Sequence, residues 1–156
     1  MKEPAWTFID ELQKPVHQQK PAFWQQRPAR GGELSLAGGL ILRQNFVDPA
    51  GVLETAWADF ARFCSVLDLA ARQDTPAVPL EIRQAETDGP ESFRLLVSPD
   101  VIRLEAADTE GIRRGIVQLE DLILASGVFF IAPAVTEKKP FVKTRLSRCF
   151  FGPIKR

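Results

Sequence analysis

The stretch that decides the fold is ESFRLLVSPDVIRLEAADTEGIRRGIVQLEDLIL, which runs from Glu91 to Leu124. Phe93, Leu95 and Val97 recur at every second position and can form one side of a strand, and Val101 to Leu104 can form a second arm. Alternation with a period of two is typical of a strand with one buried face. The letters SPD between the runs indicate a turn, because proline presets φ there. The pattern therefore predicts a β-hairpin.

A helix is expected directly after this hairpin. Asp108 is well placed to accept hydrogen bonds from the first free amides of that helix. Apolar residues at spacings of three and four predict a buried stripe of Ile112, Ile116, Leu119 and Ile123. Gly111 and Gly115 weaken a helix, and a close approach of helix to sheet would compensate for this. A phosphate-binding glycine loop is the alternative, but the spacing lacks GxGxxG and a following Lys-Ser or Lys-Thr.

Residues 48–72 contain the clearest helix pattern in the chain. Asp48 and Pro49 fit a cap followed by a first-turn proline, so the helix is expected to begin before Val52. Its buried stripe is predicted to consist of Leu53, Ala56, Trp57, Phe60, Cys64 and Leu67. On this stripe Cys64 is interpreted as a small buried hydrophobic residue.

Shorter runs predict the other strands. The run ELSLAGGLILR, residues 33–43, has apolar residues on both sides of two glycines and is interpreted as a hairpin. The run AVPLEIRQ, residues 77–84, alternates and predicts a third strand. The run GVFFIAP, residues 127–133, is apolar on both faces and predicts a central or covered strand.

The order of these elements predicts an α+β fold, a two-layer sandwich in which two main helices pack on one face of a mixed β-sheet. Residues 1–30 contain four prolines and are expected to be a lead-in with at most one short helix, over Ala5–Gln13.

Composition limits the class of protein. The chain has 156 residues, 45% of them hydrophobic and 26% charged, which fits one globular domain. Cys64 and Cys149 lie far apart and His17 is the single histidine, so we expect no metal site, no cofactor and no disulfide framework.

No apolar run approaches the about 20 residues of a membrane span, and the N-terminus lacks the apolar core of a signal peptide. As written, the sequence predicts a cytoplasmic chain that does not enter a membrane.

The net charge of zero hides an asymmetry, because residues 138–156 carry seven basic side chains and no acidic one. A basic tail can indicate nucleic-acid binding. Here the basic residues are interspersed with apolar and aromatic ones, which is typical of a folded segment. We therefore expect no nucleic-acid partner.

The opening stretch also resembles a segment of a known family. In the accessory domain that precedes the catalytic barrel of β-N-acetylhexosaminidases, the family-twenty glycoside hydrolases, the segment reads E-x-Y-x-L-x-V-x-x-D-x-I-x-I-x-A-x-D-x-x-G-x-x-x-G-x-x-x-L-x-x-L. The matching positions here are Glu91, Phe93 in place of the tyrosine, Leu95, Val97, Asp100, Ile102, Leu104, Ala106, Asp108, Gly111, Gly115, Leu119 and Leu122. A related domain leads α-glucuronidases.

This resemblance covers residues 31–145, and its specific part is the hairpin and the helix that follows. It implies the zincin-like α+β fold of the hexosaminidase accessory domain. It also implies a division of the chain into a lead-in over residues 1–30, an accessory domain over residues 31–139 and the start of a catalytic barrel over residues 140–156.

The chain departs from the family at several positions. Arg114 stands where family members often carry an aromatic residue. The family then continues with Pro-Arg-Phe-x-x-Arg-Gly; here Pro140 and Arg145 can occupy its ends, but Leu146 replaces the glycine and a phenylalanine follows where an aspartate is expected. Because the family's arginine reaches sugar hydroxyls, Arg145 is a candidate for contact with sugar. The alternative is a charged residue beside a strand. The run RLSRCFF, residues 145–151, resembles the first strand of the barrel.

The resemblance implies a non-catalytic role for this chain. The family's adjacent Asp-Glu pair, which handles the substrate's acetamido group and the leaving-group proton, lies inside the barrel. Acid–base hydrolysis of a glycoside needs two carboxylates that flank one bond. The adjacent pair here, Glu120 and Asp121, is expected on the solvent face of a helix, so no catalytic residue is nominated.

We therefore expect the N-terminal domain of a bacterial glycoside hydrolase, whose partner is the C-terminal catalytic barrel of the same parent chain. The alternative is a free-standing module that binds a carbohydrate or a protein. A small enzyme is disfavoured because His17 is isolated and no nucleophile–base pair is visible. Without its barrel, the apolar tail over residues 141–156 is expected to promote self-association.

Overall fold

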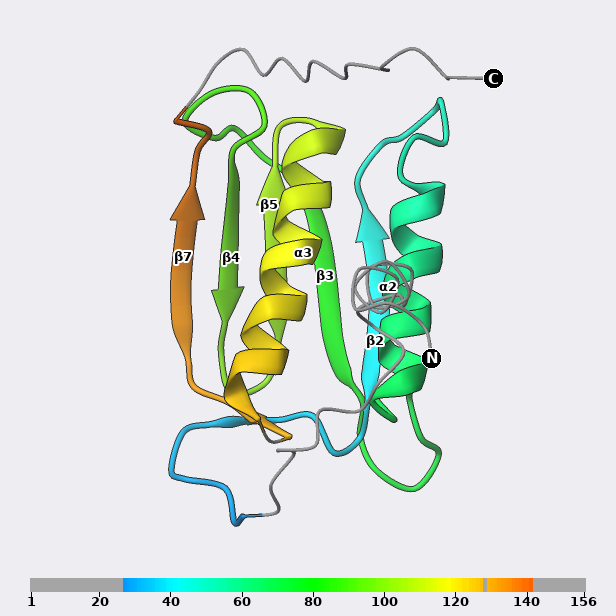
Figure 1. Cartoon of the computed structure of the whole chain (residues 1–156), viewed down its shortest axis with the longest axis vertical. Coiled ribbons are helices and arrows are strands. Elements are labelled where there is room, and N and C mark those ends of the chain that lie inside the picture. Colours follow the sequence, from blue (N-terminus) through cyan, green and yellow to red (C-terminus); the bar gives the residue numbers. More distant parts are fainter. Residues whose placement is uncertain (1–26, 128, 142–156) are drawn as a thin grey trace, which may run out of the picture.

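The computed structural model describes residues 27–127 and 129–141 (Figure 1). In chain order its elements are β1 (Leu34–Ser35), β2 (Leu40–Asn45), α2 (Glu54–Val66), β3 (Val78–Gln84), β4 (Phe93–Val97), β5 (Ile102–Ala106), α3 (Thr109–Ser126), β6 (Phe130–Ile131) and β7 (Ala134–Lys138). Within these ranges, neither helix combines the length and the apolar character that crossing a membrane requires. The helix expected at Ala5–Gln13 and the strand expected at residues 145–151 lie outside them.

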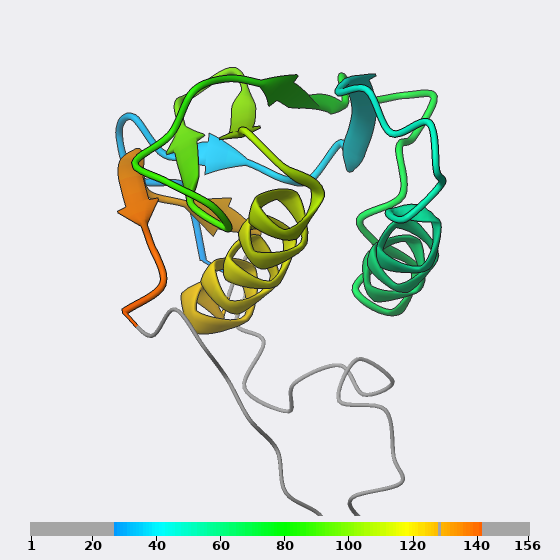
Figure 2. The same ribbon diagram turned by 90° about the horizontal axis from the view of Figure 1, so that it is seen from above.

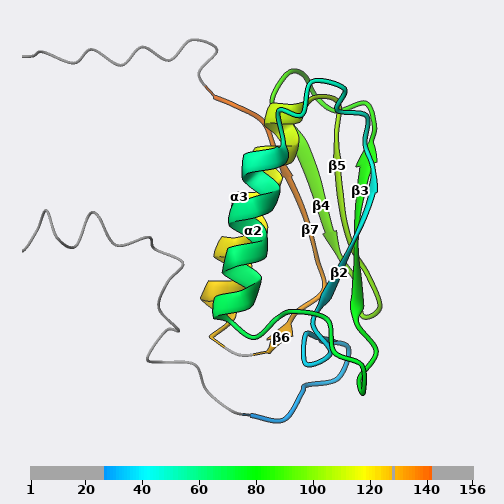
Figure 3. The same ribbon diagram turned by 90° about the vertical axis from the view of Figure 1, so that its right-hand side faces the viewer.

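The main sheet is mixed. Its five strands follow the order β2-β3-β5-β4-β7, with β2, β3 and β5 parallel and β4 antiparallel to both of its neighbours. Both helices lie on the same face of this sheet, as the view from the side shows (Figure 3). Seen from above, they form a second layer beneath the strands (Figure 2). The predicted α+β fold, with two helices on one face of a mixed sheet, is confirmed.

The hairpin predicted from the opening stretch is β4 and β5. The two strands pair from Phe93 opposite Ala106 to Val97 opposite Ile102. Every second residue points into the core, where none of Phe93, Leu95, Val97, Ile102, Leu104 and Ala106 is more than 4% exposed. Ser98 closes the turn, because its backbone amide and its hydroxyl both donate to the carbonyl of Val101 at 3.0 Å.

Helix α3 follows with the predicted buried stripe and the predicted close approach to the sheet. Ile112, Leu119 and Ile123 are fully buried and Ile116 nearly so. A Cβ placed on Gly115 would lie 2.1 Å from Cδ1 of Leu104 in β5. Non-bonded carbon atoms do not approach so closely, so glycine at this position sets how near the helix lies to the sheet.

Replacing Gly115 by alanine is expected to lower the free energy of unfolding by up to about 2 kcal/mol. The helix gains about 1 kcal/mol in intrinsic propensity, but overpacking a buried contact costs about 1–3 kcal/mol. Urea unfolding of the variant checks the sign. Shortening Leu104 to alanine should recover part of the loss in the double variant, because the two positions share one contact. Additive losses would contradict the contact.

Helix α2 is present where expected, but its ends and its buried face differ from the prediction. The Asp48 carboxylate accepts hydrogen bonds from the amides of Val52 and Leu53, at 3.1 and 2.8 Å. The helix nevertheless begins at Glu54, so Pro49 precedes the first turn instead of lying in it. The face toward the core is centred on Phe60 and on Phe63, which was not predicted and is 1% exposed. Leu53 and Leu67 are buried as predicted, whereas Ala56, Trp57 and Cys64 are only partly buried.

Two strand predictions were wrong. Residues 33–43 do not form a hairpin: β1 pairs with β6, and β2 pairs in parallel with β3. The glycines between them serve close packing, since a Cβ on Gly38 would lie 2.0 Å from the carbonyl oxygen of Pro76. In the apolar run at 127–133 a strand is present, but among the described residues it is limited to the two-residue β6, which lies outside the main sheet and is not central. The edge strand beyond it, β7, was not predicted.

The chain ahead of β1 is held by an arginine–carboxylate pair. Arg27 donates two hydrogen bonds to the carboxylate of Glu33, both at 2.7 Å, and the amide of Arg30 donates a third at 2.7 Å. The Arg27 guanidinium also lies over the ring of Phe130, 5.5 Å from its centroid. The bond from Arg27, followed by that from the Arg30 amide, lowers the pKa of Glu33 from 4.5 to about 2.

This pair predicts a pH dependence of stability. Because the pKa of Glu33 is lower in the folded chain than in the unfolded one, its contribution is present above pH 4.5 and is lost as pH falls toward about 2. The measurement is the free energy of unfolding across this window for the wild type and for Glu33→Gln. The difference between the two should shrink as the pH falls. A difference that stays constant would show that the pair does not contribute.

Candidate functional site

The most elaborate polar site lies where the chain leaves the sheet. We call it the chain-exit site and define it as the β3–β4 loop, residues 85–92, together with residues 137–140 (Figure 1). The ammonium group of Lys139 lies 2.5 Å from a carboxylate oxygen of Asp88 and ties the loop to the end of β7. This hydrogen bond lowers the pKa of Asp88 and raises the pKa of Lys139. Both side chains are exposed, so the pair fixes geometry more than it adds stability.

The loop is also fastened to the start of α3 through one carboxylate. Oδ1 of Asp108 accepts a hydrogen bond from the amide of Gly111 at 2.7 Å, which is the predicted helix cap. Oδ2 of the same side chain accepts from the amide of Glu91 at 2.8 Å. Glu91 has a φ of 60°, in the left-handed region, so this bond holds a strained residue in place. The Glu91 carboxylate in turn accepts from Arg114 at 2.7 Å.

These contacts explain several residues of the opening stretch. Glu91, Asp108 and Gly111 meet at one point, and Gly111 has no room for a side chain because a Cβ would lie 2.4 Å from the carbonyl oxygen of Ser92. Arg114, which departs from the family's aromatic residue, here forms the ion pair with Glu91. The stretch therefore fastens the loop, the hairpin and the helix to one another.

Two adjoining cavities open at the chain-exit site. One, of about 440 Å³, is lined by charged groups that include Glu86, Arg94 and Glu137. The other, of about 500 Å³, is lined by the loop residues 88–92 and by Pro140. Asp88, Ser92 and Lys139 line both cavities. Ser92 is 3% exposed, and its hydroxyl has no hydrogen-bond partner within the described part of the chain. A buried hydroxyl without a partner is unusual and calls for an explanation.

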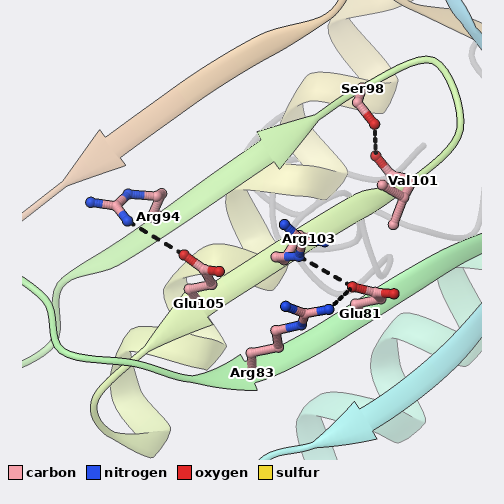
Figure 4. A network of polar contacts seen from close by, with 7 residues as sticks. All are labelled: Glu81, Arg83, Arg94, Ser98, Val101, Arg103 and Glu105. Atoms are coloured by element: carbon pink, nitrogen blue, oxygen red, sulfur yellow. Dashed lines mark hydrogen bonds and ion pairs between the residues drawn. The ribbon is translucent and has the colours of Figure 1, made fainter.

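The outer face of the sheet carries a ladder of ion pairs (Figure 4). Arg83 and Arg103 both donate to the carboxylate of Glu81, at 2.7 and 3.1 Å, and Arg94 lies between Glu105 and Glu137, at 3.5 and 2.5 Å. Hydrogen bonding to Arg103 is the main cause of a lowered pKa of Glu81. These charges pair with one another within β3 and across neighbouring strands, and the same face also exposes Ile41 and Val135.

The adjacent carboxylates on α3 do not behave as expected. Asp121 is exposed, but Glu120 is only 5% exposed, so the prediction of a solvent-facing pair was wrong. Glu120 lies on the side of α3 nearest α2, where it lines a small cavity together with Thr55 and Ala56. Burial, together with the charge of Glu120, raises the pKa of Cys64 to about 12. At neutral pH this thiol is protonated and is a poor nucleophile.

The other residues singled out from the sequence are placed as follows. Arg145, Cys149 and His17 lie outside the described residues. Lys138 and Lys139 of the basic tail both bind the domain, through Gln118 and Asp88 respectively. In the ranges 27–127 and 129–141, no group of three or more His, Cys, Asp or Glu side chains could hold a metal ion. Sequence reasoning missed Ser92, because a serine in a loop carries no signal of its own burial.

Comparisons with known proteins find similarity to solved structures. No protein-family model matches the sequence, and no curated protein matches it either. Among solved structures, a chitobiase from Flavobacterium johnsoniae is similar, with a TM-score of 0.44 and 17% sequence identity. The match covers 79% of this chain and 21% of the chitobiase chain, so this chain spans about a fifth of that protein's length.

Proposed function

We propose that residues 31–139 form the non-catalytic N-terminal accessory domain of a bacterial glycoside hydrolase and support an adjacent catalytic barrel that begins within residues 140–156. The observation that carries the proposal is the fastening of the loop, the hairpin and α3 by Glu91, Asp108 and Gly111. These are positions of the sequence resemblance, and here they act together on the packing of one unit.

The end of β7 supports a direction for the interdomain contact. Residues 139–141 leave the sheet on the side of the helix layer, as the side view shows (Figure 3). Exposed apolar side chains occur on both faces, with Val117 at 56% on the helix layer and Val135 at 62% on the outer face of the sheet, so they do not distinguish the two faces. From the course of residues 139–141 we propose that a following domain meets the helices first, and that Arg145 contacts its sugar substrate.

The first test is the DNA sequence of the reading frame that contains this chain. Beyond Arg156 it should encode a barrel with the adjacent Asp-Glu pair, and a stop codon there in the native gene would contradict the proposal. The second test is an activity assay of the purified 156-residue chain. We expect no turnover of nitrophenyl N-acetylglucosaminide or nitrophenyl glucuronide above buffer. Release that survives repurification would make the chain an enzyme in its own right.

A shortened chain that ends at Lys139 tests the boundary of the domain. If residues 140–156 belong to the next domain, their removal should leave the melting temperature unchanged and reduce self-association, measured by light scattering. Cooperative unfolding of the shortened chain at a much lower temperature would assign the tail to the core of this domain. The shortened chain retains Lys139 and Asp88, so their ion pair is not a variable in the comparison.

A further inference from the structure

We propose that the outer edge of β2 is a docking site for an extended, acidic segment of a partner protein, which adds a strand to the main sheet. This goes beyond the proposed function, which gives the domain no partner other than the barrel. It is also independent of whether a barrel follows, because β2 lies at the opposite edge of the sheet from β7, where the chain leaves it.

The edge of β2 carries backbone groups that can pair with another strand. The amide of Leu40 donates to the carbonyl of Leu69 at 2.8 Å, on the side opposite β3, which binds the carbonyl of Gly39. Successive amides of a strand point to opposite sides, so the amides and carbonyls of Leu42 and Gln44 also point away from β3. Within the ranges that the structure describes, no backbone group of another segment binds them. An extended segment can therefore dock here by strand addition.

The charges beside this edge determine the chemistry of the segment. On the outer face Arg43 lies opposite Glu81 in the register of β2 and β3. Glu81 already binds Arg83 and Arg103, at 2.7 and 3.1 Å (Figure 4). Arg43 is exposed and forms no ion pair with any residue of the described ranges. The three arginines around one carboxylate leave an excess of positive charge, so a carboxylate on the added strand, opposite Arg43, would continue the ladder of ion pairs.

Exposed apolar side chains on both faces of β2 define the rest of the segment. Ile41 is 44% exposed on the outer face, and Leu42 is 40% exposed on the face toward the helix layer, where it lies opposite the buried Leu80. Side chains of a strand alternate between the two faces, so a β-branched residue beside Leu42 places its neighbour beside Arg43. We therefore expect a segment in which β-branched residues flank an acidic one.

The opposite edge of the sheet is less suited to this role. β7 carries Glu137 and Lys138 next to each other, both exposed, and Pro140 follows shortly after the strand. Charges of both signs and a proline are features that protect an edge strand from pairing. Strand β2 has Arg43 as its single charged residue and contains no proline. The two edges therefore differ in a way that favours docking at β2.

The probe is the acetylated and amidated peptide TVEVT, and TVKVT is the matched peptide of opposite charge. Both are titrated into the 15N-labelled 156-residue chain and followed by NMR. We expect saturable shifts of the Leu42, Arg43 and Gln44 amides with TVEVT, and binding of TVKVT that is weaker by about threefold or more. Added salt should reduce this difference. In the free chain, the outward amides of Leu42 and Gln44 should exchange with deuterium faster than those of Ile41 and Arg43, which point to β3.

Two variants separate the contribution of charge from that of the backbone. Arg43→Glu should weaken the binding of TVEVT by about three- to tenfold and reverse the preference between the peptides, because opposite charges become like charges. Gln44→Pro removes an outward amide and should weaken both peptides, since proline on an edge strand leaves the bonds to β3 in place. Lys138→Glu makes the same change in net charge on β7 and should leave binding unchanged. Arg43→Glu, at an exposed position, keeps the test decisive if Gln44→Pro does not fold.

Four results would overturn the proposal. One is the absence of saturable shifts at β2 with TVEVT, and another is equal affinity for the two peptides, which would give Arg43 no role. The third is slow exchange of the Leu42 and Gln44 amides in the dilute free chain, because another segment of the same chain would then occupy the edge. The fourth is a shift of these amides when the protein concentration is raised without peptide, which would assign the edge to a second copy of the chain.

Discussion

Replacing Phe63 by alanine is expected to lower the free energy of unfolding by about 3–5 kcal/mol, the usual loss when a buried phenylalanine is truncated. The ring is 1% exposed and stacks on that of Phe60, with centroids 6.1 Å apart. Phe63 is the most deeply buried side chain of α2, so it makes the main contact of this helix with the core. Since small domains are stable by about 5–15 kcal/mol, this loss takes up a large part of the total.

Guanidinium unfolding of Phe63→Ala, followed by circular dichroism, measures this loss. Glu54→Ala in the same helix is the matched control, because Glu54 is exposed, and its effect should stay within about 0.5 kcal/mol. Comparable small losses for both variants would mean that α2 does not present this face to the sheet.

The second large effect is expected at Asp108. Alanine there removes the cap of α3, a loss of about 0.5–2 kcal/mol, and leaves the amide of Glu91 without its acceptor, a further loss of about 1–3 kcal/mol. Together the free energy of unfolding should fall by about 1.5–5 kcal/mol. An asparagine side chain has only one acceptor oxygen and can serve one of the two amides, so Asp108→Asn should lose about half as much.

Thermal and urea unfolding of the two Asp108 variants test whether Asp108→Ala loses more stability than Asp108→Asn. Asp121→Ala, which replaces an exposed aspartate on the same helix, is the control and should have little effect. Equal losses for Asp108→Ala and Asp108→Asn would show that only one of the two hydrogen bonds contributes to stability.

The parts of the fold that could be predicted from sequence are those fixed by neighbours along the chain. The β4–β5 hairpin and α3 have clear periodicities, a proline turn and a capping aspartate, and all were found in place. The pairing of β2 with β3 could not be predicted, because parallel strands are joined through a helix and no local turn records their pairing. The two glycines at 38–39 therefore looked like a hairpin turn, although they serve backbone packing.

The same reasoning explains why the burial of Phe63 and Glu120 and the presence of the two cavities were not predicted. Residues 63 and 64 both fit a spacing of three and four residues between Phe60 and Leu67. The surface against which α2 packs therefore decides that Phe63 is buried more deeply than Cys64. Glu120 continues the stripe of Ile116 and Ile123, but its charge favoured a solvent position in the prediction. The two cavities depend on residues from separate segments of the chain, and sequence spacing carries no information about such a meeting.

The local nature of the hairpin and α3 also bears on how the chain assembles during synthesis. The contacts that residues 93–126 make with one another close only short loops, so their entropic penalty is small. β3, by contrast, leaves the ribosome before its neighbour β5 exists, and β7 can complete the sheet only after α3 has crossed it. We therefore expect folding to begin in the second half of the domain, at the β4–β5 hairpin and α3. The earlier apolar segments, β2 and α2, then pack on this part.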